Sequence, residues 1–158
     1  AKPLAGGLPF AATFARGDIM AALKRGEHSN TFGGNPLSCA ASVAAVDALI
    51  EDRLVENAAE IGGLLKMGFE EYAAGSRMIR EVRGLGLMLG IDMRFEIMNI
   101  ILGCLDKGVI VLESGKTVLR MLPPLVMAKA EAETVVKTVC ATIGEDERKR
   151  AVGPAAGA

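Results

Sequence analysis

The sequence predicts an α/β chain, and three observations support that class. Hydrophobic residues make up 51% of the 158 residues and charged residues 23%, which is typical of a folded protein with a buried core. Some segments repeat apolar residues every three to four positions, whereas others are short apolar runs, so both helices and strands are expected. The 19 glycines exceed what a plain helical bundle tolerates, because glycine weakens helix interiors.

The N-terminal half is expected to hold one strand and three helices. We predict a strand over residues 10–15, which has no neighbouring strand in this part of the sequence, and then a short helix that ends near residue 25. Asn35 and Pro36 indicate a helix start, because Asn caps free amides and Pro has no amide hydrogen to lose. The helix that follows is apolar on almost every face, so we expect it to be buried between layers. A second long helix over residues 52–72 has one polar face.

The C-terminal half is expected to combine two strand pairs with two helices. The predicted elements, in order, are strands over 78–83 and 87–93, a helix over 97–105, strands over 109–113 and 117–122, and a helix over 132–143. The first two strands flank Gly84-Leu85-Gly86, which predicts a turn or bulge. We place a boundary at Gly75, because the residues after it could form a small α+β domain. The charged run after residue 144 leads into an Ala/Gly-rich tail that we expect to be mobile.

Charge and cysteine content exclude several classes of function. A net charge of -1 leaves no basic excess for a phosphate backbone, so no nucleic-acid partner is expected. No apolar run approaches the roughly 20 residues of a membrane-spanning helix, and the N-terminus lacks a signal-peptide pattern, so we expect a cytoplasmic protein with no membrane partner. Cys39, Cys104 and Cys140 lie far apart without a nearby histidine, so we expect buried free thiols and no metal site.

Two polar segments could carry chemistry. Lys2 precedes a glycine-rich turn and an apolar run, where a partly desolvated amine could form a Schiff base; the alternative is an exposed lysine at a frayed terminus. Residues 27–36 place hydroxyls, amides and glycines before a helix start, which favours anion binding, with Ser29 and Thr31 as additional donors. The alternative is an ordinary polar loop, in which His28 is a loop residue rather than a catalyst.

A third motif, Gly84-Leu85-Gly86 with Gly90, could be mistaken for a dinucleotide-binding fingerprint. Its last glycine lies one position late, and no helix is predicted to follow it. We therefore interpret the segment as strand, turn and strand.

Five segments together resemble the C-terminal portion of class III (ω-type) pyridoxal-phosphate (PLP) aminotransferases, which include acetylornithine, ornithine and 4-aminobutyrate aminotransferases. They are KPLAGGLP at 2–9, HSNTFGGNPLSCAA at 28–41, LVENAAEIG at 54–62, VRGLGLMLGID at 82–92 and VLRMLPPL at 118–125. The resemblance implies the C-terminal part of a fold-type-I PLP-dependent transferase. Residues 1–75 would be the end of the PLP-binding large domain with its connecting helix, 76–144 the small α+β domain, and 145–158 the mobile tail.

The resemblance also implies roles for three residues. Lys2 matches the lysine that forms the internal aldimine with PLP and then moves a proton between substrate and cofactor. Thr31 matches the threonine that hydrogen-bonds the cofactor phosphate of the neighbouring subunit, which implies a homodimer. Arg120 matches the arginine that binds a substrate carboxylate, and a guanidinium at a strand end suits such bidentate binding. The family's other cofactor contacts precede these segments and are absent from this sequence, so we expect the isolated chain to be inactive.

The implied reaction is transfer of an amine from an ω-amino donor, such as acetylornithine or ornithine, to the 2-oxo acid 2-oxoglutarate. The segments around Thr31 and Arg120 resemble the acetylornithine/ornithine branch slightly more than the 4-aminobutyrate branch. Pro3 and Ser29-Asn30 depart from the common family pattern without removing a reactive group. Three alternatives remain, namely a 4-aminobutyrate-type aminotransferase, a glutamate-semialdehyde aminomutase, and a non-catalytic dimerisation or interaction module.

Overall fold

The computed structural model describes residues 4–152, and its contacts divide the chain into two compact units. The first unit ends at Leu54 and the second begins at Val55. This division comes about twenty residues before the predicted boundary at Gly75, because the second long helix packs into the core of the second unit through Ile61, Leu65 and Phe69. That helix therefore belongs to the second unit.

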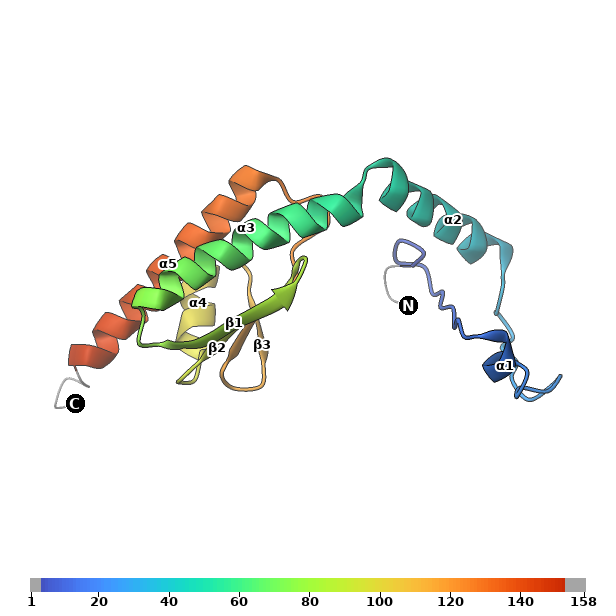
Figure 1. The fold of residues 1–158 in the computed structure, drawn as a ribbon, viewed down its shortest axis with the longest axis horizontal. Helices are drawn as coiled ribbons and strands as arrows, with labels where there is room; N and C mark the ends of the chain where they lie inside the picture. Colours follow the sequence, from blue (N-terminus) through green and yellow to red (C-terminus); the bar gives the residue numbers. More distant parts are fainter. Residues whose placement is uncertain (1–3, 153–158) are drawn as a thin grey trace. The chain divides into compact units, whose positions relative to one another are not determined.

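The first unit contains α1 (Gly17–Met20) and α2 (Pro36–Glu51), which Figure 1 shows joined by loops. The predicted start of α2 is confirmed: the Asn35 side-chain oxygen accepts a hydrogen bond from the Ser38 amide at 2.9 Å. The described residues do not supply the layers between which we expect α2 to be buried, since Val43 is 62% and Ile50 70% exposed. The described part of the first unit is too small to cover a helix that is apolar all round.

The predicted strand over residues 10–15 is also wrong. Residues 10–16 have no regular structure, and Phe14 is 91% exposed. A strand needs a partner for its backbone hydrogen bonds, and the described residues of the first unit contain no other strand. The short helix predicted before residue 25 is confirmed as α1.

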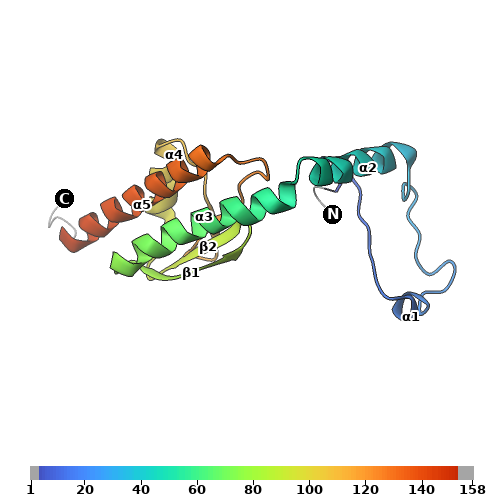
Figure 2. The ribbon, with the colours of Figure 1, turned by 45° about the horizontal axis from the view of Figure 1, so that its top comes forward.

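The second unit is a four-stranded antiparallel sheet in the order β1-β2-β4-β3, together with three helices. Figure 2 labels these helices and the strands β1 and β2. Its elements are α3 (Leu54–Gly75), β1 (Ile79–Leu85), β2 (Met88–Met93), α4 (Met98–Asp106), β3 (Leu112–Ser114), β4 (Val118–Met121) and α5 (Lys129–Val152). Every element predicted after Gly75 is present. The largest differences are that β3 begins three residues late and that α5 begins three residues early and ends nine residues late.

The hairpin of β1 and β2 depends on glycines at its turn. Gly84 has φ +156°, and a Cβ there would lie 2.3 Å from the Met88 carbonyl oxygen. The turn also lies against α3, because a Cβ on Gly62 would be 2.1 Å from the Gly86 carbonyl oxygen. The glycines therefore let the hairpin tip touch the helix backbone.

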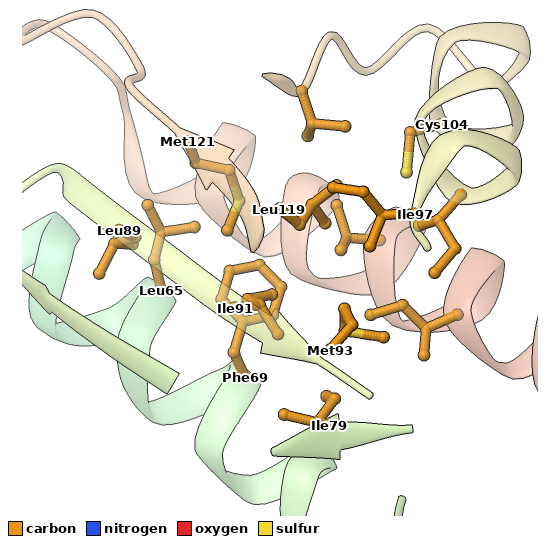
Figure 3. Close-up of a cluster of buried hydrophobic side chains, with 14 of the residues drawn as sticks. Leu65, Phe69, Ile79, Leu89, Ile91, Met93, Ile97, Cys104, Leu119 and Met121 are labelled. Atoms are coloured by element: carbon orange, nitrogen blue, oxygen red, sulfur yellow. The ribbon is translucent and has the colours of Figure 1, made fainter. Parts of the chain in front are cut away.

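The hydrophobic core lies between one face of this sheet and the helices (Figure 3). Side chains alternate between the two faces of a strand, so the buried residues of β2 and β4 identify the core face. The core-facing strand residues are Leu89, Ile91, Met93, Leu119 and Met121, and the residues packed on them include Leu65 and Phe69 of α3, Cys104 of α4 and Ile97 just before α4. The opposite face, called the outer face below, carries Glu81, Arg83, Gly90, Asp92, Val118 and Arg120.

We expect a mobile tail from residue 145 onward. Residues 145–152 instead belong to α5, which continues through Val152. The Glu147 carboxylate accepts hydrogen bonds from the Ser76 hydroxyl and the Arg77 amide, both at 3.3 Å. One turn later, Arg150 pairs with Asp146, donates to the Glu96 carbonyl at 3.2 Å and covers a phenylalanine ring. These contacts hold the charged run in the helix. None of the helices within residues 4–152 has the length and apolar composition needed to span a membrane.

Candidate functional site

Arg120 lies within β4 on the outer face. Its register partners are Gly90 on β2 and Leu112 on β3. Leu119 and Met121 on either side of it are buried in the core, so strand alternation places Arg120 on the opposite face. Within residues 4–152, its guanidinium has neither a hydrogen-bond nor an ion-pair partner. Arg120 is therefore a half-buried cation that is available to an anion.

The other arginines of this face are compensated by carboxylates. The Asp92 side chain is 12% exposed and lies 3.2 Å from Arg80 and 3.8 Å from Arg83. Its second oxygen accepts a hydrogen bond from the Thr117 hydroxyl at 3.2 Å. Arg83 also pairs with Glu81 at 2.8 Å. Two guanidiniums are thus matched by two carboxylates, whereas Arg120 is left without a counter-ion in the described part of the chain.

Arg120 also contributes to the wall of an apolar cavity of about 360 Å³ in the second unit. The remaining walls come from α3, α5, the strands β3 and β4, and the segments that flank these strands. Among the described lining residues, Arg120 alone is charged.

The loop that contains Thr31 is shaped by its own hydrogen bonds. The Asn30 side-chain oxygen accepts from the Phe32 amide at 2.9 Å, and the Asn35 side-chain amide donates to the Phe32 carbonyl at 3.0 Å. Gly34 has φ +70°, which suits glycine. The loop and residues 8–11 line a cavity of about 570 Å³ in the first unit. Thr31 is exposed and lies outside this lining, and no partner engages its hydroxyl in the described residues.

The start of α2 offers fewer free amides than the anion site predicted there requires. Pro36 has no amide hydrogen, the Ser38 amide donates to the Asn35 side chain, and the Cys39 amide donates to the Asn35 carbonyl. Within the described residues, this leaves the Leu37 amide for an external anion. The expected anion site at this helix start is therefore corrected to a single backbone donor beside the loop hydroxyls.

The remaining candidates differ in what the structure says of them. Lys2 lies outside the described residues. His28 is exposed and lines the first unit's cavity. Cys104 is buried and Cys140 half-buried, and burial raises the pKa of the Cys140 thiol to about 11, which keeps it protonated. No group of three or more His, Cys, Asp or Glu side chains within residues 4–152 could hold a metal ion.

The sequence alone does not reveal the contacts of Asp92 with Arg80, Arg83 and Thr117, or the position of Gly90 between two arginines. Gly90 and Asp92 are two residues apart on one strand, so they share a face, and Arg83 and Arg120 flank Gly90 on the neighbouring strands. The spacing within β2 is readable from the sequence. The register that brings three strands together is not.

Residues 1–143 match the family model of the class-III aminotransferases, and the chain belongs to this family. Over 139 residues it is 40% identical to ornithine aminotransferase 1 of Staphylococcus saprophyticus, covering 87% of this chain and 35% of that protein. Over 137 residues it is 38% identical to acetylornithine aminotransferase 1 of Bordetella pertussis, again covering 87% of this chain and 35% of the relative. The chain thus spans about a third of the length of these curated relatives.

A solved structure shows the same fold. The ornithine aminotransferase of Toxoplasma gondii superimposes with a TM-score of 0.79 at 28% identity, over 84% of this chain and 32% of that one. That enzyme is described as having partial occupancy of PLP at its active site. The predicted family and fold class are therefore confirmed.

Proposed function

We propose that the chain forms part of a PLP-dependent aminotransferase that moves an amine from an ω-amino donor to 2-oxoglutarate. Family membership and the names of the relatives support transamination and the ornithine/acetylornithine class of donor. The observation that carries the proposal is the uncompensated guanidinium of Arg120 on a sheet face where Arg80 and Arg83 are both paired with carboxylates. Both substrates carry a carboxylate that such a fork can bind.

The described residues of the first unit fit the phosphate of PLP in chemistry. The Thr31 hydroxyl is exposed and unengaged, the Leu37 amide is without an acceptor in the described residues, and the bare backbone of Gly33 and Gly34 lies between them in sequence. Hydroxyl and amide groups are the donors that phosphate oxygens accept. PLP, when bound, supplies an electron sink for bonds made and broken at the carbon that bears the substrate amine.

In this proposal three residues divide the work. Lys2 would hold the cofactor covalently in the resting enzyme and, once the substrate amine has displaced it, its free amine would carry a proton to and from the reacting carbon. Thr31 donates a hydrogen bond to the phosphate of the cofactor in the neighbouring subunit. Arg120 binds the substrate carboxylate through two parallel N–H donors and so fixes the orientation of the substrate.

The partner in this proposal is a second copy of the protein. The apolar residues of α2 that the chain leaves uncovered, among them Val43 and Ile50, support a subunit interface there. The loop over residues 27–35 immediately precedes α2 and would lie at the same interface. This arrangement gives Thr31 access to a neighbour's cofactor.

The experiment uses a chimaera in which this chain replaces the matching region of the Bordetella acetylornithine aminotransferase. We expect it to transfer an amine from acetylornithine or ornithine to 2-oxoglutarate and to show a Lys2-dependent cofactor absorption band. Lys2→Ala should abolish both signals, whereas Lys24→Ala, an exposed lysine of the same unit, should leave both unchanged. A folded chimaera that binds PLP but transfers no amine, or a Lys2→Ala variant that stays active, would contradict the proposal.

A further inference from the structure

Gly90 lies between two arginines on the outer face of the sheet, and its missing side chain leaves the backbone between them uncovered. It lies inside β2 and pairs laterally with Arg83 on β1 and with Arg120 on β4. Residues paired across antiparallel strands point to the same face, so all three lie in one row on the outer face. Between the two arginines the surface of the sheet is therefore bare backbone.

The fold gives little reason for a glycine at this position. Gly90 does not have a positive φ, and the register of β2 with β4 is regular there, so neither a turn nor a bulge requires it. A Cβ at Gly90 would meet only a Val118 methyl, at 3.2 Å, whereas one at Gly84 would meet backbone at 2.3 Å. Glycine weakens a strand interior, and where no bulge or bend explains it, it marks the close approach of a ligand or another backbone.

The charges around Gly90 indicate which kind of ligand approaches this glycine. On one side Arg120 is without a counter-ion in the described residues, and on the other side Arg83 is held by Glu81 and Asp92. A carboxylate that lies over Gly90 can pair with Arg120 without competing for Arg83. A side chain at this position would rise into the same space.

We propose that Gly90 is a specificity-determining residue, whose missing side chain leaves room over β2 for the carboxylate end of a small substrate bound by Arg120. The inference rests on the proposed function, because it takes Arg120 as the carboxylate-binding residue. It adds that the size of residue 90 sets which acids reach this guanidinium.

The test compares Gly90→Ala and Gly90→Val in the PLP-loaded chimaera. We expect Gly90→Val to raise the KM for 2-oxoglutarate about tenfold or more, and Gly90→Ala to raise it less, with cofactor affinity unchanged in both. Glutarate, a dicarboxylate that cannot be transaminated, should raise the thermal unfolding midpoint of the parent protein but not that of Gly90→Val. Ser114→Val is the matched control, since it adds a β-branched side chain to the same face in the next row of the sheet.

A second variant separates access to Arg120 from packing. Gly90→Val with Val118→Ala relieves the one close contact that a Cβ would make. If the raised KM comes from blocked access, it persists in the double variant, whereas restoration of the parental KM would show a packing effect and overturn the inference.

The remaining outcomes distinguish the role of Gly90 from the proposed aminotransferase function. If Arg120→Lys raises the KM for 2-oxoglutarate but Gly90→Val leaves it within twofold, the role of Gly90 is wrong and the proposed function stands. If the folded chimaera binds cofactor but transfers no amine, both fail.

Discussion

The two units of the chain differ in how they cover their apolar side chains. In the second unit, α3, α4 and α5 share one core with the sheet, and Leu65, Phe69 and Ile91 are fully buried. In the first unit, α2 is apolar nearly all round, yet its buried residues are Ser38 and Ser42. Hydrophobic residues alone therefore do not predict burial; what matters is how much partner surface the same unit supplies.

The largest expected effect compares a buried side chain of the second unit with an exposed side chain of α2. Phe69→Ala should destabilise the second unit by about 3–5 kcal/mol, because it removes a fully buried ring and leaves a cavity. Val43→Ala on α2 should change stability by less than about 0.5 kcal/mol, because that side chain is 62% exposed. Urea unfolding of the chain followed by circular dichroism measures both. Equal effects would show that α2 is buried after all.

A smaller effect tests the contact between α3 and the hairpin tip. Gly62→Ala should cost about 1–3 kcal/mol, since the new methyl would meet the Gly86 carbonyl at 2.1 Å and backbone yields poorly. Gly63→Ala is the matched control, because a Cβ there meets nothing within 4 Å and alanine favours a helix. It should stabilise the chain by about 0.4–1 kcal/mol. A neutral Gly62→Ala variant would show that the hairpin does not touch the helix as described.

The smallest expected effect concerns the end of α5. Arg150→Met should destabilise the second unit by about 1–2 kcal/mol, because it leaves the buried Asp146 carboxylate unpaired and loses the hydrogen bond to Glu96. Lys149→Met changes the same charge at an exposed neighbouring position and should be nearly neutral. Thermal unfolding compares the two. If both variants unfold at the parental temperature, residues 145–152 form a loosely attached end, as the sequence suggests.

Local signals in the sequence predict the start of α2 and most elements of the second unit. The cap at Asn35, the apolar stripes of the helices and the glycine turn between β1 and β2 are all decided by neighbours in sequence. The prediction of a strand over residues 10–15 is wrong, because an apolar run carries no information about whether a second strand is present to pair with it. The end of α5 was missed because its charged residues pair with Ser76, Arg77 and Glu96, which are far away in sequence.

The candidate site also has features that the sequence reveals and features that depend on contacts between distant residues. Lys2, Thr31 and Arg120 were found through a family resemblance, which preserves residue identity but carries no local geometry. The lack of a counter-ion at Arg120 and its pairing with Gly90 depend on strand register, which side-chain alternation alone does not fix. The sequence predicts the Asn35 cap at the start of α2, but the cap also occupies the Ser38 amide and so removes a donor from the expected anion site.

The central claim is that Arg120 is the carboxylate-binding residue of an aminotransferase, and Arg120→Lys in the chimaera tests it most directly. Lysine keeps the charge but loses the two parallel N–H donors, so transition-state binding of the acid should weaken. Rapid-mixing measurement of the reaction with 2-oxoglutarate should show kcat/KM reduced at least tenfold, with PLP affinity unchanged. The same substitution at the exposed Arg94 serves as the control. An Arg120→Lys variant with parental kinetics for both amino donor and acceptor would contradict the account.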